Sequence, residues 1–296
     1  MSEDDLDGTI AWRDLLEETR GRLERSGRVD DPRTEARWIV EDVLGVTGAE
    51  YHDLLDALAT VRGVAKLDRM VERRVTGEPI QYVLGHWAFR SLDLLVDSRV
   101  LIPRPETEVV AGIAMEELRR LNPDGGVAVD LGTGSGAIGL SIATECPGAT
   151  VVLTDASDAA LAVARANLAG IGMAGASVEI HAGSWFAALP ERFKGAIDVV
   201  VSNPPYVTDD AELPASVAEW EPESALRAGP DGLDDLRELV ADAAEWLAPS
   251  GAIVLEMDPE QTGVVVELGE ASGWNGVVRA DLAGRDRAVV LRRGSA

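Results

Sequence analysis

The sequence of 296 residues is poor in cysteine, in lysine and in long apolar runs. Its single cysteine, Cys146, permits no intramolecular disulfide, argues against a cysteine-based zinc site, and suits a reducing compartment. No apolar stretch approaches the roughly 20 residues of a membrane-spanning helix. Residues 1–5 are acidic, whereas a secretory signal is basic and then apolar. These features predict a soluble, cytoplasmic protein without a membrane partner.

Lysine occurs only at Lys66 and Lys194, and the formal net charge is −25. Proteins that bind nucleic acid neutralise its phosphates with lysine and arginine, and this sequence has no cluster of either. We therefore expect no direct nucleic-acid partner. The acidity is interpreted as an adaptation to solubility or salt rather than as a match to a charged partner.

The first part of the chain has helical periodicity. Asp31 and Pro32 provide an N-cap and a first helical residue, and Gly45 ends that helix. Two further helices are expected over residues 49–58 and 64–75, with the charged side chains on solvent-facing surfaces. No set of side chains here suits catalysis, so a docking or packing role is predicted.

The middle and the end of the chain indicate a mixed α/β fold. Two strand-like runs predict a β-hairpin, and a helix to about Leu121 follows. Strands then alternate with helices, which is typical of a largely parallel sheet. The expected strands cover residues 127–131, 151–154, 178–181, 197–201, 252–256, 277–281 and 287–291. We predict a seven-stranded, Rossmann-like sheet that is mostly parallel and ends in an antiparallel edge hairpin.

The predicted organisation has three parts. Residues 1–82 form a small all-α N-terminal domain with a docking role, residues 83–102 form a β-hairpin linker, and residues 103–296 form a larger α/β domain. A glycine-rich turn after the first strand of that sheet, here called the glycine turn, consists of Gly132, Thr133, Gly134, Ser135 and Gly136. Glycines let a backbone approach a ligand closely and present N–H groups at a helix start.

Two acidic residues bear on the ligand of the glycine turn. The run from Gly134 to Gly139 matches the dinucleotide fingerprint G-x-G-x-x-G, which alone is a weak signal. Asp130, just before the turn, is awkward beside a pyrophosphate but suits a cationic ligand. Asp155 ends the second strand, where an acid hydrogen-bonds the ribose of either kind of nucleoside cofactor. Trp185 either covers an adenine ring or packs in the core.

A stiff tetrapeptide ends the fourth strand of the sheet. This segment, here called the bracket, consists of Asn203, Pro204, Pro205 and Tyr206. Each proline lacks an N–H and biases the preceding residue to an extended conformation. The bracket therefore offers an amide side chain, accessible carbonyls and an aromatic face, a set that suits a planar group bearing an NH₂.

The glycine turn, Asp155 and the bracket together resemble the class I methyltransferases that use S-adenosylmethionine to modify NH₂ groups. Further stretches, residues 77–85, 102–108 and 284–287 and the segment after the bracket, resemble the family of peptide chain release factor glutamine methyltransferases. The resemblance extends through nearly the whole chain. Two departures from the family pattern are Ser184, where an acid is usual, and the pair Met257 and Asp258, which replaces a glycine-containing pair and is expected to alter a turn.

The resemblance implies an enzyme that methylates N5 of the glutamine in the Gly-Gly-Gln motif of class 1 release factors during translation termination. The five residues of the glycine turn, Asp155, Trp185 and Asn203 would bind S-adenosylmethionine. Asn203, Pro204 and Tyr206 would be catalytic, and the whole bracket would hold the glutamine. No metal is implied, and a monomer is expected.

Three other functions remain open at this stage. The first is an amino-methyltransferase that acts on another protein glutamine, such as one in a ribosomal protein, or on the exocyclic amine of a nucleobase. The second is an NAD-dependent oxidoreductase, which would leave the bracket without a role. The third is a domain that only binds a partner.

Overall fold

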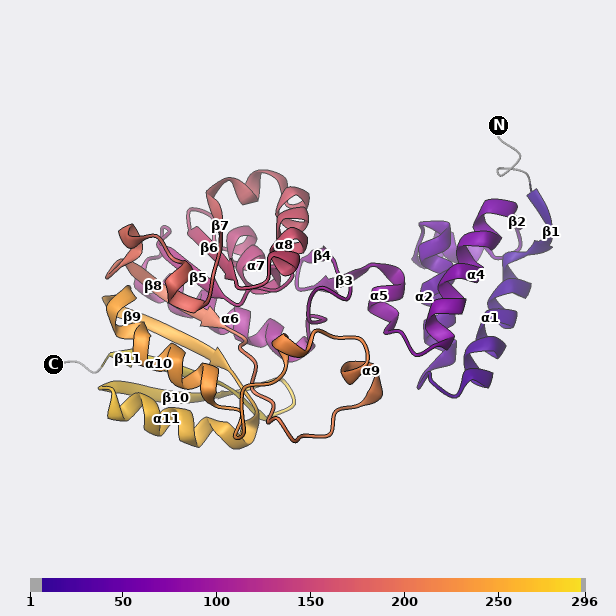
Figure 1. Cartoon of the computed structure of the whole chain (residues 1–296). Coiled ribbons are helices and arrows are strands. Elements are labelled where there is room, and N and C mark those ends of the chain that lie inside the picture. The colour runs from indigo at the N-terminus through magenta and orange to yellow at the C-terminus, as the bar shows by residue number, and fades with distance from the viewer. Residues whose placement is uncertain (1–6, 294–296) are drawn as a thin grey trace. The chain divides into compact units, whose positions relative to one another are not determined.

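The computed structural model describes residues 7–293, which form two compact units. The first unit extends to Gly85 and includes a later segment, Pro214–Trp220. The second comprises His86–Leu213 and the chain from Glu221 onward. Figure 1 labels the helices and strands of both. No helix within residues 7–293 is long and apolar enough to cross a membrane. The acidic start of the chain lies outside the described residues.

The first unit is mostly helical, as its periodicity predicts. Its helices are α1 (Trp12–Ser26), α2 (Pro32–Leu44), α3 (Gly48–Leu54), α4 (Val61–Val75), α5 (Ile80–Leu84) and α9 (Ala215–Ala218). At the start of α2 the Asp31 side chain accepts a 3.1 Å hydrogen bond from the N–H of Thr34. At its end Gly45 has a φ of +70°, which glycine adopts without strain. Both predicted ends of this helix are confirmed.

A two-stranded sheet is the part of this unit that the helical pattern does not predict. β1 (Asp7–Ala11) pairs antiparallel with β2 (Leu58–Thr60), so that Asp7 lies opposite Thr60. The strands have only five and three residues and lie far apart in the sequence, so no local pattern signals their pairing. The all-α prediction needs this addition, and the helix expected over residues 49–58 ends earlier, at Leu54.

The ion pair between Glu35 and Arg74 is buried in the first unit. The guanidinium of Arg74 donates to both carboxylate oxygens of Glu35, at 2.5 and 3.1 Å, and both residues are buried. The expectation that all charged side chains of this region face solvent is wrong here. Removing either partner would leave a buried charge without compensation, so the pair constrains the packing of α2 against α4.

The second unit begins with the predicted hairpin, which is confirmed. β3 (His86–Phe89) and β4 (Leu92–Leu95) are antiparallel neighbours. The helix α6 (Pro105–Leu121) follows, with proline at its first position and two glutamates in its first turn. Proline suits that position because its missing N–H would have no helical partner there, and the glutamates complement the positive end of the helix.

Seven strands form the main sheet, as predicted. They are β5 (Val127–Leu131), β6 (Thr150–Asp155), β7 (Val178–Ala182), β8 (Ile197–Ser202), β9 (Leu247–Glu256), β10 (Trp274–Ala280) and β11 (Asp286–Arg293). Their order across the sheet is β10-β11-β9-β8-β5-β6-β7. The pairs among β5 to β9 are parallel, whereas β11 is antiparallel to both β9 and β10. The predicted edge hairpin is confirmed, and its second strand is inserted between β9 and the edge strand β10.

Helices cover the sheet along its whole width. α6 packs against β8 and β9, α7 (Ala137–Glu145) against β5 and β6, and α8 (Asp158–Gly170) against β6 and β7. α10 (Asp234–Trp246) packs against β9, and α11 (Thr262–Ala271) against β10 and β11. Figure 1 shows the last two helices side by side over the β9–β11 half of the sheet.

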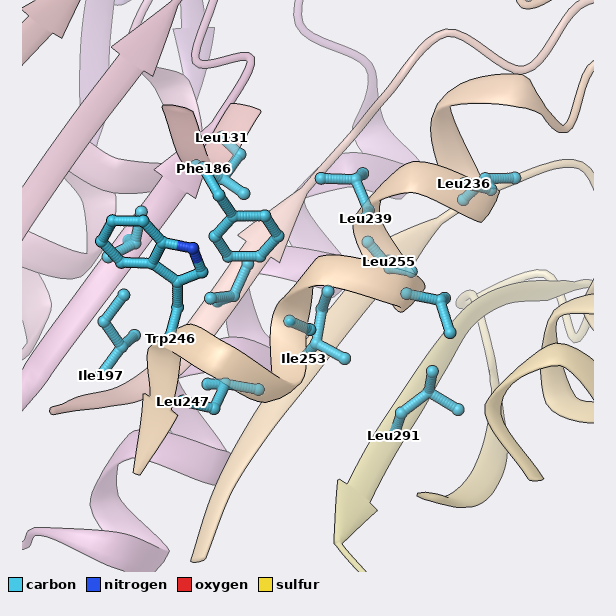
Figure 2. Packing of buried hydrophobic residues seen from close by; sticks show 14 of the residues in the cluster. Leu131, Phe186, Ile197, Leu236, Leu239, Trp246, Leu247, Ile253, Leu255 and Leu291 are labelled. Carbon is cyan, nitrogen blue, oxygen red and sulfur yellow. The ribbon is translucent and has the colours of Figure 1, made fainter. Parts of the chain in front are cut away.

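An extensive apolar cluster lies between α10 and the strands. Figure 2 shows Leu131 and Ile253 from the strands near Leu239 of α10, and Phe186 beside Trp246. The Phe186 and Trp246 rings are stacked with centroids 6.1 Å apart. Each such buried side chain contributes roughly 1.5–3 kcal/mol. Because side chains alternate along a strand, the residues next to those of the cluster point to the opposite face, towards α6 and α7.

Candidate active site

The glycine turn and the bracket meet where the strand order reverses. β5 has β6 on one side and β8 on the other, and ligands of open α/β sheets bind beyond the carboxyl ends of strands at such a point. The Ser202 hydroxyl, at the end of β8, donates a 2.6 Å hydrogen bond to the carbonyl of Leu131, at the end of β5. The two predicted motifs therefore start from directly connected strand ends.

The backbone of the glycine turn adopts conformations that favour glycine. The φ angles are +71° at Gly132, +55° at Gly134 and +87° at Gly136. A Cβ on Gly132 would also lie 3.0 Å from the Trp185 ring. The N–H of Thr133 donates to the carbonyl of Thr154 at 2.8 Å, which holds the turn against β6. The turn thus leads into α7 with its backbone open to a ligand, at the end of the helix that favours acceptor atoms.

Asp130 is a buried carboxylate beneath the glycine turn. Its Oδ2 accepts hydrogen bonds from the Thr133 hydroxyl at 2.6 Å and the Gly139 N–H at 2.9 Å. Its Oδ1 has no hydrogen-bond partner within residues 7–293. Burial raises the pKa of this carboxyl to about 6, so it is mostly ionised at neutral pH. An unpaired negative oxygen at the cavity attracts a cation or a hydrogen-bond donor.

Asp155 connects the end of β6 to the glycine turn. Its Oδ2 accepts from the Gly134 N–H at 2.9 Å, and its Oδ1 accepts from the Ser157 N–H at 2.8 Å. Each carboxylate oxygen can accept more than one hydrogen bond, so both can still bind a diol. The backbone contacts orient the carboxylate before any ligand arrives.

Trp185 has an unusual backbone conformation. Its φ is +42°, a region that residues other than glycine rarely occupy and that is often found at functional positions. Its indole N–H donates to Asp235 of α10 at 3.2 Å. The side chain both lines the cavity and packs against the apolar cluster. Its surroundings therefore suit both interpretations of this residue, ligand contact and core packing.

The bracket places its four residues in different surroundings. Asn203 and Pro205 line the cavity, while Pro204 is buried. Tyr206 packs against the apolar cluster and is absent from the cavity lining found within residues 7–293. Burial raises the pKa of the Tyr206 phenol to about 12, so it stays neutral. The Asn203 Nδ2 donates to the Thr107 hydroxyl at 3.4 Å, a long hydrogen bond that leaves the amide oxygen for a ligand.

Met257 and Asp258, the pair that departs from the family pattern, lead into a turn that is hydrogen-bonded to the bracket. Asp258 and Gln261 form a capping box around the short turn Pro259–Gln261. The Gln261 side chain also donates to the carbonyls of Tyr206, at 2.9 Å, and Gly232, at 3.1 Å. The altered pair thus builds a fixed turn that holds the end of the bracket.

Hydrogen bonds of Glu221 connect the segment before α6 to the segment after the bracket. The buried carboxylate of Glu221 accepts from the Ile102 N–H at 3.1 Å and from the Arg104 guanidinium. Two stretches that are distant in the sequence, and that both carry the resemblance, are therefore in contact at the cavity.

The cavity has a volume of about 300 Å³ and an acidic lining. Three carboxylates contribute to it, namely Asp130, Asp155 and Asp235. Arg99 is the one cation of this lining in the described part of the chain, and it forms an ion pair with Asp97 at 2.6 Å. Such a site suits a cationic ligand and disfavours the pyrophosphate of a dinucleotide. The residues thus fit the sulfonium cofactor of methyltransferases.

Most of the predicted cofactor residues line this one cavity. They are Gly132, Thr133, Gly134, Ser135, Asp155, Trp185 and Asn203. Gly136 is instead the N-cap residue of α7, just beyond the lining. Sequence reasoning assigned no site role to Thr107 and Asp235, which also line the cavity. Thr107 lies in the 102–108 stretch that carries the resemblance, so the sequence pattern could have indicated its role in the site. The residues around Asp235 in the sequence contain no such pattern.

The chain matches two known family models. Residues 112–220 match the model of the methyltransferase small domain, and residues 14–85 match that of the PrmC N-terminal domain. A methyltransferase structure from Pyrococcus furiosus has a TM-score of 0.51 at 19% identity, over 70% of this chain and 92% of its own, which shows a shared fold. S-adenosylmethionine is the expected cofactor of a methyltransferase domain such as the one matched here.

Two relatives resemble the chain over nearly its full length. The release factor glutamine methyltransferase of Deinococcus radiodurans is 39% identical over 284 residues, 95% of this chain and 98% of its own. That of Moorella thermoacetica is 40% identical over 290 residues, 96% of this chain and 99% of its own. The chain belongs to the family of release factor glutamine methyltransferases.

Proposed function

We propose that this chain transfers a methyl group from S-adenosylmethionine to the side-chain nitrogen, N5, of the glutamine in the Gly-Gly-Gln motif of class 1 release factors. Membership of the family supports this substrate. The observation that carries the proposal is the position of Asn203, whose amide oxygen is available in the same acidic cavity as the glycine turn. Methylation of that glutamine would act in translation termination.

Different residues of the cavity would bind different parts of the cofactor. When bound, S-adenosylmethionine supplies an electrophilic methyl group on a positively charged sulfur. The glycine turn would lie along its methionine and ribose, the Asp155 carboxylate would hold the ribose hydroxyls, and Trp185 would lie beside the adenine. The carboxylate of Asp130 would favour the positive charge of the ligand over a neutral product.

The bracket would hold the glutamine side chain by its NH₂ group. The Asn203 Oδ1 would accept one N–H and the Pro204 carbonyl the other, while Pro205 and the ring of Tyr206 would bound the amide plane. An amide nitrogen is a poor nucleophile because its lone pair is delocalised. Two fixed acceptors place it for an in-line attack and offset the positive charge that develops on it. The proton would leave late, to water.

The three parts of the chain would have different roles. The N-terminal region, residues 1–82, would dock the release factor, and the hairpin of residues 83–102 would link it to the catalytic part, residues 103–296. The separate family match of residues 14–85 supports a dedicated role for that region. We further propose a cytoplasmic monomer that binds no nucleic acid directly.

Mass spectrometry of a release factor incubated with the enzyme and S-adenosylmethionine tests the function. We expect a gain of one methyl group on the glutamine of Gly-Gly-Gln. A parallel incubation with a ribosomal-protein fraction and with nucleic acid tests the other amino-methyltransferase functions. Methylation only in those parallel samples would overturn the proposal.

A substitution in the bracket tests its role in catalysis. Asn203→Ala should lower the rate of methyl transfer by roughly 10²–10³-fold, because one of the two fixed acceptors is lost. Cofactor binding, measured by calorimetry, should fall far less than turnover does. Asn275→Ala, at an exposed asparagine on β10, is the matched control and should behave as the wild type. Near-normal turnover of Asn203→Ala would contradict the assigned role.

A further inference from the structure

Glu256 is a buried acid whose two oxygens are unpaired. It ends β9, is fully buried, and has no hydrogen-bond partner for either carboxylate oxygen within residues 7–293. A buried carboxyl without partners costs several kcal/mol if ionised, so such groups in native proteins call for an explanation. Sequence reasoning gave this residue no role.

The strand register places Glu256 beside the bracket. β8 and β9 are parallel, and Ser202 pairs with Leu255. The next residues along the two strands are Asn203 and Glu256, so their backbones lie side by side at the strand ends. On the other side of β9, Glu256 pairs with Ala288 of β11.

Thr107 is hydrogen-bonded to Asn203 and acts electrostatically on Glu256. It is buried in the first turn of α6, lines the cavity, and its hydroxyl accepts the hydrogen bond from Asn203 Nδ2. The Thr107 side chain also lowers the pKa of the Glu256 carboxyl, although neither carboxylate oxygen has a hydrogen-bond partner within residues 7–293. A hydroxyl carries one proton, so a threonine that accepts from Asn203 must donate elsewhere, and the Glu256 carboxylate is the adjacent acceptor.

We propose that Thr107 and Glu256 are positioning residues that turn the Asn203 amide so that its oxygen, rather than its NH₂, faces the substrate. This proposal rests on the proposed function of the bracket. An ionised Glu256 cannot donate, so Thr107 donates to it and accepts from Asn203 Nδ2. The donor and acceptor roles along the hydrogen bonds from Asn203 to Thr107 to Glu256 are then fixed. Asn203 Oδ1 is left facing the cavity as an acceptor.

Protonation of Glu256 would reverse this polarity. A protonated carboxyl can donate to Thr107, whose own proton is then available to Asn203 Oδ1. The flipped amide would present its NH₂ to the N–H groups of the substrate, which places two donors face to face. A flipped Asn203 therefore cannot hold the glutamine nitrogen for attack.

The charged groups around Glu256 set the pH range of this effect. Burial raises the pKa of the Glu256 carboxyl to about 7, the Thr107 hydroxyl opposes that shift, and Glu106 of α6 adds to it. Arg287 of β11 and Arg104, before α6, lower the pKa of Glu256. The phenol of Tyr206, whose pKa is raised by burial and by Glu256, is neutral. Turnover at saturating cofactor should therefore fall as the pH drops through about 7.

Three variants test the positioning role. Thr107→Val keeps the shape but removes the hydroxyl, and Glu256→Gln keeps the shape but can donate to Thr107. Both should lower kcat roughly 10–100-fold, the scale found when a group that orients a metal ligand is removed, while the Kd of the cofactor changes much less than kcat. Thr107→Ser keeps the hydroxyl and should restore most of the turnover. Wild-type turnover in Thr107→Val would overturn the proposal.

The pH profile separates positioning from a structural role. Glu256→Gln should lose the fall of kcat below about pH 7, because it has no carboxyl to protonate. Glu117→Gln is the matched control, since Glu117 is another buried glutamate, on the same helix as Thr107 but paired with Arg292 at 2.5 Å. This control should keep the acidic fall of kcat. An unchanged acidic fall in Glu256→Gln would overturn the proposal.

A measurement without turnover keeps this proposal distinct from the proposed function. Nitrogen-15 NMR of the holoenzyme should show the Asn203 side-chain NH₂ protected from exchange in the wild type and in Thr107→Ser. That protection should be lost in Thr107→Val. If the wild type fails to methylate a release factor, the proposed function fails while this readout still tests the orientation of Asn203. Equal exchange in all three proteins would contradict the positioning role.

Discussion

Gly139 is the third glycine of the dinucleotide-like pattern, and the structure shows why a larger residue should not fit. A Cβ added there would lie 2.0 Å from Cδ2 of Leu153, a fully buried residue of β6. Carbon atoms normally pack 3.5–4.0 Å apart, so one of the two must shift by about 1.5 Å. The same Cβ would lie 3.1 Å from Oδ2 of Asp130, which accepts the Gly139 N–H.

Gly139→Ala should therefore destabilise the protein and weaken cofactor binding. Overpacking of this kind costs about 1–3 kcal/mol, and the gain of roughly 1 kcal/mol in helix propensity offsets it only in part. Gly112→Ala is the matched control, because Gly112 is in the middle of α6 and its added Cβ meets only Arg90 Nη1, at 3.5 Å. That control should stabilise the protein by about 0.5–1 kcal/mol.

Thermal unfolding and calorimetry with S-adenosylmethionine measure both effects. For a protein of this size each 1 kcal/mol shifts Tm by roughly 1.5–2 °C, so the two alanine variants should move Tm in opposite directions. Gly139→Ala should also bind the cofactor less tightly, because Asp130 is displaced. A stabilised Gly139→Ala with wild-type affinity would refute the packing argument.

Two further predictions concern charged groups. Hydrogen bonds from Arg292 lower the pKa of the buried Glu117, so its stabilising effect is present above about pH 4.5 and is lost as the pH falls. The difference in unfolding free energy between the wild type and Glu117→Ala, measured in urea, should therefore shrink from neutral pH to about pH 3.5; a constant difference would contradict this. Asp155→Ala should weaken cofactor binding by about 10–100-fold, which corresponds to the free energy of a hydrogen bond to a charged group. Calorimetry measures this affinity, and Asp286→Ala, at an exposed aspartate on β11, is the control. Equal affinities of these two variants would exclude the ribose contact.

Local sequence patterns predicted the helices and strands of this fold more completely than the pairing of its strands. Asp31 with Pro32 and Gly45 are local signals, because the groups they satisfy belong to the same helix. The β1–β2 pair has no such signal, since its two strands lie far apart in the sequence. The insertion of β11 between β9 and β10 has the same character, because a hairpin pattern does not say which of its strands joins the sheet.

The site divides in the same way. The glycine turn and Asn203 were predictable, because the residues that shape each motif are consecutive in the chain. Asp235 and Glu256 were not, because their importance comes from neighbours contributed by other elements, Trp185 and Thr107. A lone acid at a strand end has many possible surroundings, and only packing selects one of them.

The position of β11 has a consequence for how the protein is made. Residues 286–293 are the last described strand, yet they hydrogen-bond to β9 and β10 on either side. During synthesis, β9 and β10 leave the ribosome with exposed edges that cannot pair correctly until this strand follows. The nascent chain should therefore remain open to aggregation until residues 286–293 emerge, and a stop codon before residue 286 should abolish folding rather than shorten an edge strand.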